Sequence, residues 1–286
     1  MQKITQMNKN MQQISKSFLQ SGNDLPITKT LHFKHPTIQE IIDIDKDHNG
    51  LYSEEVYYAM INIFLTDPYT YMVYLDDKGL DFECVKPFEL FIILYNDYIG
   101  KLKSMESMIS NEQLQELNRN NIYLRSIKFF FGVDDFFIAK DETGETVLGY
   151  GDNELLIDSN SYNYIFEFIK KINGIQESEH INPEDKWAKQ ILIDDEREKL
   201  KKLAQKQENN DEESHRDKLG NLLSSITWSC NGGVTPFNRN QLHMYDLVDG
   251  MQRTDKLLNY KNTMVGLYSG CVEKKHINFD DLHWSN

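Results

Sequence analysis

The stretch FELFIILYNDYI, residues 88–99, is apolar nearly all round and follows Pro87. Proline is favoured at the first position of a helix, where its missing N–H would have no partner in any case. A helix that is hydrophobic on every side is buried rather than amphipathic. The stretch therefore predicts a buried helix around which the rest of this half of the protein folds.

Shorter helices are predicted on the N-terminal side of this stretch. HPTIQEIIDI, residues 35–44, carries three isoleucines on one face and has Pro36 at a first-turn position. Ser53 is a candidate N-cap for the next helix, whose first turn holds two glutamates. Asp67 followed by proline predicts the start of a third helix, which Gly79 ends.

The pattern changes to short aromatic and aliphatic runs between residues 125 and 158. SIKFFFG, FFIAK, TVLGY and ELLID are separated by clusters of Asp and Gly, which is typical of strands joined by tight turns. Thr143-Gly144 lies where a hairpin turn needs a positive φ. The helical segment SYNYIFEFIKKING then ends at Gly174. We expect a small antiparallel β-meander with a helix against it.

The C-terminal half returns to helix. A long charged helix is predicted from Asn182-Pro183 to about Gln207, followed by a polar linker and a small helical C-terminal unit. The predicted fold class is mainly α with a small antiparallel β-meander (α+β). The predicted domains are an N-terminal amphipathic helix (1–34), a main α+β domain (35–178), a charged helix with linker (179–217) and a helical C-terminal domain (218–286).

Composition limits the classes of function. The 286 residues carry a formal net charge of −14, which argues against a nucleic-acid-binding surface, since such surfaces cluster Lys and Arg. The three cysteines are far apart and predict no disulfide framework. No apolar run is long enough for a signal peptide or a membrane span. We expect a cytoplasmic protein without a membrane partner.

One loop has part of a calcium-binding pattern. Asp45, Asp47 and Asn49 occupy the first, third and fifth positions of an EF-hand-like loop, with Gly50 at the sixth. The twelfth position, which should be a bidentate glutamate, is Val56. An ordinary polar turn and a weak calcium site are the two interpretations.

No cluster of residues predicts catalysis. The sequence has no nucleophile elbow and no paired zinc-ligand spacing, so we expect no enzyme activity, no catalytic residues and no cofactor other than the weak calcium candidate.

Both ends of the chain carry apolar stripes at helical spacing. Ile4, Met7, Met11, Ile14 and Phe18 form the first, and residues 242–258 contain the second. Each stripe either lies on the protein's own core or docks a partner, and both alternatives remain open.

Three groups of segments resemble a protein family that occurs in tailed phages and prophages of low-GC Gram-positive bacteria. The first comprises HPTIQEIIDI and residues 57–91, the second FFFGVDDFFI and residues 155–174, and the third MYDLVDGMQRTDKLLNYKNTMVGLYSGCVEKKHINFDDLHW at 244–284. The last segment is similar to the end of phage tail assembly chaperones, which are acidic helical proteins with a terminal tryptophan. The loop from Asp45 to Ser53 looks like an insertion relative to that family.

The resemblance implies a non-catalytic role in virion morphogenesis, in which the chain binds a tape-measure or tail-tube protein in the bacterial host. Aromatic and Met side chains dominate helix-binding surfaces, so the predicted contact residues are Met244, Tyr245, Met251, Leu257, Leu258, Tyr260 and Trp284. The same stripes also permit self-association. The alternatives are a structural tail or connector component of the virion and a calcium-responsive regulatory protein.

Overall fold

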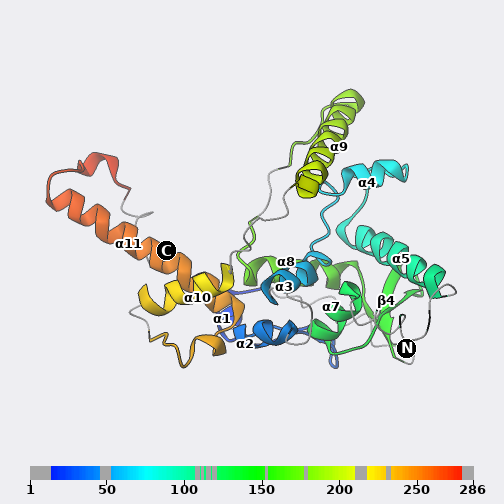
Figure 1. Ribbon diagram of the computed structural model, residues 1–286, viewed down its shortest axis with the longest axis horizontal. Helices are drawn as coiled ribbons and strands as arrows, with labels where there is room; N and C mark the ends of the chain where they lie inside the picture. The colour runs from blue at the N-terminus through cyan, green and yellow to red at the C-terminus, as the bar shows by residue number, and fades with distance from the viewer. Residues whose placement is uncertain are drawn as a thin grey trace.

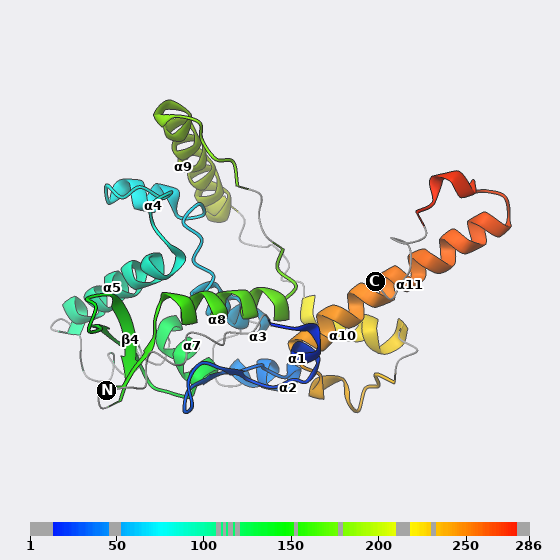
Figure 2. The same ribbon diagram turned by 180° about the vertical axis from the view of Figure 1, so that it is seen from behind.

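The computed structural model describes residues 14–45, 53–106, 121–151, 154–176, 180–209, 218–229 and 233–278, together with residues 110, 113 and 117. Its described part consists of a helical body from which two long helices, α9 (Lys186–Asn209) and α11 (Met244–Tyr268), project in different directions (Figures 1 and 2).

The remaining elements belong mainly to the body. The helices and single turns are α1 (Lys16–Gln20), α2 (Ile38–Ile42), η1 (Asp43–Asp45), α3 (Ser53–Asn62), α4 (Met72–Asp77), α5 (Pro87–Glu106), α7 (Ile122–Phe131), α8 (Ser159–Ile172), α10 (Lys218–Ser229), η2 (Arg239–Gln241) and η3 (Lys274–His276). The strands are β1 (Leu25–Pro26), β2 (His32–Phe33), β3 (Phe137–Lys140), β4 (Thr146–Tyr150) and β5 (Glu154–Ile157). The predicted fold class, mainly α with a small antiparallel sheet, is confirmed.

The predicted buried helix is α5, and it contributes to two hydrophobic clusters. Phe88 and Phe91 belong to the main core, where the Phe91 ring stacks on Phe64 with centroids 5.8 Å apart. Leu90 instead packs with Leu75 and with other residues under α4 and α9. Helix α5 carries apolar residues on all sides because the two clusters cover it from more than one side.

An aromatic cluster forms the centre of the main core. Phe33 of β2 is completely buried and stacks on Phe130 of α7, with ring centroids 4.7 Å apart and planes 8° apart. The edges of three further phenylalanine rings meet it, those of Phe64, Phe131 and Phe168. Offset and edge-to-face arrangements of this kind are favourable for aromatic quadrupoles. A two-residue strand thereby supplies the residue around which α7, α8 and the turn after α3 pack.

The prediction of a strand at SIKFFFG is wrong, because these residues lie in helix α7 and at its end. The side chain of Asn121 accepts a hydrogen bond from the backbone N–H of Leu124, and Gly132 ends the helix with φ +70°. The helical spacing buries Ile127, Phe130 and Phe131 on one face. Burial of that face outweighs the weak preference of phenylalanine for strands.

The other three predicted strands are confirmed as β3, β4 and β5, which form an antiparallel sheet in that order. Gly144 has φ +84° in the β3–β4 turn, as the hairpin required. The Tyr95 hydroxyl donates to the carbonyl of Phe136, at 2.9 Å, and joins α5 to the start of this sheet.

The start of the predicted helix at residues 35–44 differs in detail. Pro36 lies before the helix, and Thr37 is the N-cap of α2, with Glu40 completing a capping box. Ser53 was expected to cap α3, but it lies in the first turn and its hydroxyl donates to the carbonyl of Ile42. The third predicted helix begins later than Asp67, at Met72, and Gly79 follows it with φ +70°.

The described part of the N-terminal stripe packs against the protein's own core. Ile14 is buried, and the ring of Phe18 lies 6.3 Å from that of Phe168. Ile4, Met7 and Met11 lie outside the described residues. The interpretation as a helix on its own core therefore holds for Phe18 of α1, whereas Ile14 packs on the core from the segment before that helix.

Helices α10 and α11 share the main core with the body. Leu219, Ile226 and Leu247 belong to the same hydrophobic cluster as Phe33, and the buried Glu54 carboxylate of α3 accepts a hydrogen bond from the backbone N–H of Leu219. The domain boundaries proposed from the sequence stay a prediction.

Helix α9 is held against α4 by a small apolar contact and two groups of ion pairs. Ile193 packs with Leu75, while Lys189 pairs with two carboxylates and lies 4.8 Å from the Phe82 ring centroid. Arg197 pairs with Asp76 at 3.0 Å and with the next residue, another aspartate, at 2.6 Å. Both apolar packing and ion pairs therefore attach α9 to this part of the body.

We expect Arg197→Ala to loosen α9 without unfolding the body. Loss of this exposed ion-pair network should change the local opening equilibrium of α9 by about fivefold or less. Hydrogen exchange of the α9 amides should accelerate by that factor in dilute salt and by less in 1 M salt, where charges are screened. Lys201→Ala, at an exposed position of the same helix, is the control. Equal exchange rates in both variants would contradict the ion-pair attachment.

Candidate functional site

Helix α11 divides into an anchored base and a projecting half. At the base, α11 packs on α10, α8 and α1, and Gly250 lets the Ile226 side chain approach closely. Residues 254–268 extend away from the body in both views (Figures 1 and 2). We call these residues the α11 arm. At 1.5 Å per residue the arm is about 22 Å long.

An ion-pair network fixes the last anchored turn. Asp249 accepts a hydrogen bond from Arg253 at 2.7 Å and pairs with Lys16 of α1 at 3.2 Å. Burial raises the pKa of the Asp249 carboxyl, but the hydrogen bonds from Arg253 and Lys16 lower it by more. The pKa of Asp249 therefore lies below its usual value. The carboxylate therefore stays charged and ties α11 to the N-terminal helix.

Backbone hydrogen bonds join the start of α11 to a segment some 200 residues earlier. The N–H of Ile38 donates to the carbonyl of Leu242 at 2.8 Å, and the N–H of Met244 donates to the carbonyl of Pro36 at 3.1 Å. This short antiparallel bridge fixes the direction in which α11 leaves the body.

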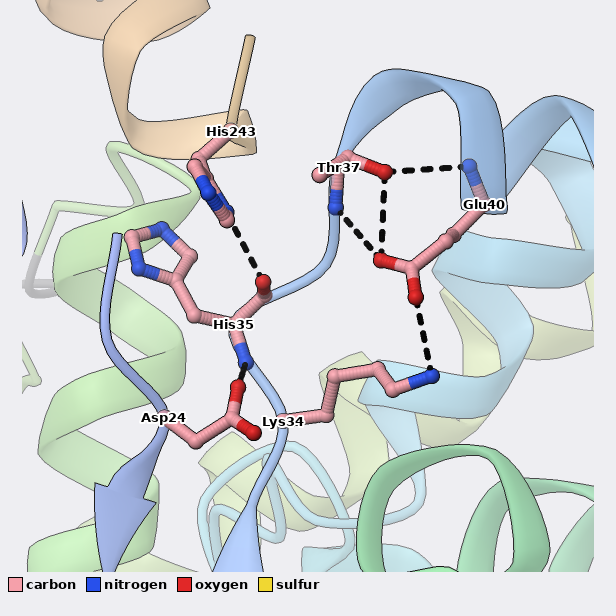
Figure 3. Close-up of polar contacts among 6 residues, drawn as sticks. All are labelled: Asp24, Lys34, His35, Thr37, Glu40 and His243. Atoms are coloured by element: carbon pink, nitrogen blue, oxygen red, sulfur yellow. Dashed lines mark hydrogen bonds and ion pairs between the residues drawn. The ribbon is translucent and has the colours of Figure 1, made fainter. Parts of the chain in front are cut away.

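Two histidines lie at this junction (Figure 3). The His243 Nδ1 lies 2.9 Å from the carbonyl oxygen of His35, and the backbone N–H of His35 donates to the Asp24 carboxylate at 2.8 Å. Beside them, Glu40 accepts hydrogen bonds from Thr37 and pairs with Lys34. The backbone of His35 is therefore hydrogen-bonded to His243 through its carbonyl and to Asp24 through its N–H.

The His35 imidazole is buried among apolar groups. Only 2% of the residue is exposed, its ring lies 5.5 Å from that of Phe168, and neither ring nitrogen has a hydrogen-bond partner among the described residues. Burial lowers the pKa of His35 to about 4, and the electrostatic interaction with His243, whose ring is 4.7 Å away, also lowers it. The ring is therefore neutral at neutral pH.

The α11 arm presents a wide apolar face. On a helix of 3.6 residues per turn, its apolar residues cover about half of the circumference. Leu258 is 50% exposed, Val265 67% and Tyr268 82%. The face consists of Leu257, Leu258, Tyr260, Met264, Val265, Leu267 and Tyr268.

The predicted contact residues fall into two groups. Met244 and Tyr245 are buried in the main core, and Met251 packs against it. These three anchor α11 and are not on its projecting surface. Leu257, Leu258 and Tyr260 lie on the arm, and Trp284 lies outside the described residues.

The outer half of the arm was not among the predicted contact residues. Met264, Val265, Leu267 and Tyr268 continue the spacing of three and four that begins at Leu257, so the signal was present in the sequence. The exposed Trp228 at the end of α10 was also missed.

The calcium candidate is left as a prediction. Asp45 is the last residue of η1, whereas Asp47 and Asn49 lie outside the described residues. Among the described residues, no three His, Cys, Asp or Glu side chains lie together in a way that could hold a metal ion. Within the same residues, no helix is long and apolar enough to cross a membrane.

The fold and this surface define a mainly helical protein with a projecting helix that exposes apolar side chains. Residues 207–286, which include α10 and all of α11, match the family model described as the YomV second domain. YomV is a protein of a Bacillus phage region, so the match relates this chain to phage proteins and confirms that level of the resemblance. Among curated proteins and among solved structures, no match was found.

Proposed function

We propose that this protein is a phage morphogenesis factor of the tail-assembly-chaperone type, which binds a tail component in the cytoplasm of the bacterial host without catalysis. The observation that carries the proposal is the α11 arm, an apolar helical surface that projects from the body. It lies in the segment that matches a phage-region family.

The properties of the α11 arm support binding to an apolar partner protein. An isolated helix of about 15 residues is marginal in water, so the arm gains stability when a partner covers it. Each large apolar side chain that a partner buries contributes up to about 1.5–3 kcal/mol. Meanwhile the net charge of −14 keeps the free protein dispersed. A partner such as the tape-measure protein, with long apolar helices, suits helix-in-groove binding.

Co-expression with the neighbouring tape-measure protein tests the proposal. The native chain should raise the soluble fraction of that protein, and the double variant Met264→Asp with Leu267→Asp should abolish the effect, because two carboxylates would be buried in an apolar contact. Asn259→Asp with Asn262→Asp, on the polar side of the same helix, adds the same charge and should leave the effect intact. If the apolar-face variant still rescues the partner, α11 is not the binding surface.

A structural connector is the second candidate, because α9 forms another projecting element. Trp187 is 75% exposed, and Leu200 and Leu203 are also exposed on this helix. Two separate protruding helices suit a protein that joins two neighbours in the virion. Mass spectrometry of purified particles distinguishes the two functions, since a connector is present in fixed stoichiometry and an assembly chaperone is absent.

A further inference from the structure

The apolar face of the α11 arm contains one charged residue. Lys261 lies one turn after Leu257 and Leu258, and one turn before Met264 and Val265. Residues three and four apart share a helix face, so Lys261 is surrounded by apolar side chains rather than placed at their margin. The side chain is exposed, and no carboxylate among the described residues pairs with it.

A partner that covers this face must also cover Lys261. An ammonium group that loses water without gaining a counter-charge is costly, and the cost falls when a carboxylate pairs with it. Asp255, the acidic residue of the arm, lies on the polar side of the helix and so cannot serve a covered Lys261. Among the described residues of the arm no other carboxylate is available, so we expect the covering partner to supply the counter-charge.

We propose that the α11 arm selects an apolar helix that carries an Asp or Glu within its own apolar face, where it pairs with Lys261. The inference rests on the proposed function and names the chemistry of the partner. A second α11 arm is a poor occupant, because its apolar face offers a lysine and no carboxylate. An anionic membrane is disfavoured as well, since it would repel a protein with a net charge of −14.

Two synthetic helical peptides of equal length test the inference with the full chain. Both carry leucines along one face, and they differ at one central position of that face, which is Glu in one peptide and Lys in the other. Fluorescence anisotropy should show that the Glu peptide binds about tenfold or more tightly, as opposite charges across an interface provide. Lys261→Met should make the two affinities equal, and Lys261→Glu should reverse the preference. Lys201→Glu, the same change on α9, should preserve it.

The outcomes separate this inference from the proposed function. Equal binding of both peptides to the native chain overturns the role of Lys261, although helix docking would stand. If neither peptide binds while the tape-measure protein is still rescued through the apolar face, the inference fails and the function survives. Binding to phosphatidylglycerol vesicles in place of the peptides identifies a membrane surface. Concentration-dependent dimers that Val265→Asp abolishes identify a second copy.

Discussion

Replacing Phe33 by alanine is expected to lower the free energy of unfolding by about 3–5 kcal/mol, the usual cost of deleting a buried phenylalanine ring. Phe33 is completely buried and contacts four other phenylalanine rings, contributed by the turn after α3, by α7 and by α8. Its removal leaves a cavity that several elements would have to close at once. Since domains are stable by only about 5–15 kcal/mol, this one substitution removes a large part of the total.

Urea unfolding followed by circular dichroism measures this loss in the free energy of unfolding. Phe237→Ala is the matched control, because Phe237 is 94% exposed and its removal should change stability by less than about 0.5 kcal/mol. A loss of under about 1 kcal/mol for Phe33→Ala would contradict a close-packed aromatic centre.

Acidification is expected to destabilise the protein through His35. Its pKa is about 4 in the folded chain and 6.5 in the absence of tertiary structure. Between these values the unfolded chain binds a proton that the folded chain does not, so stability is lost as the pH falls from above 6.5 toward 4. At about 1.36 kcal/mol per pKa unit, the loss amounts to about 3 kcal/mol.

The contribution of His35 is isolated by comparing pH profiles. Urea unfolding is measured for the native chain and for His35→Leu at several pH values between 7.5 and 4. Because only the native chain carries the titrating ring, its free energy of unfolding should fall by about 3 kcal/mol relative to that of His35→Leu over this range. His32→Leu, at an exposed histidine, should follow the native profile. A pH-independent difference between the native chain and His35→Leu would show that the buried ring is not the titrating group.

The expected effect of acid bears on the proposed function because His35 lies at the base of the α11 arm. His35 and His243 lie where the chain enters α11, beside the backbone hydrogen bonds that set the direction of the arm. Groups that face this junction include Asp24 and the Lys34–Glu40 pair (Figure 3). We therefore expect a charge on His35 to affect both the base of the arm, through His243, and the aromatic centre, through Phe168.

Much of the fold was predictable because its signals are local. Pro87 at the start of α5, the turn at Gly144 and the glycine at 174 each act within a few residues of the chain. The hairpin segments of β3 to β5 and the long charged helix were recognisable for the same reason. Segment α7 was misassigned because a run of three phenylalanines suits either a strand or a helix until the surface that covers it is known.

The sequence by itself determined the helical character of this protein, its acidic surface and the apolar stripe along α11, because composition and periodicity are properties of neighbouring residues. Only the tertiary structure decided which part of that stripe is core and which is surface. Met244 is covered by segments some 200 residues earlier in the chain, whereas Val265 projects beyond them. Burial depends on contacts between distant segments, and no local pattern specifies those contacts.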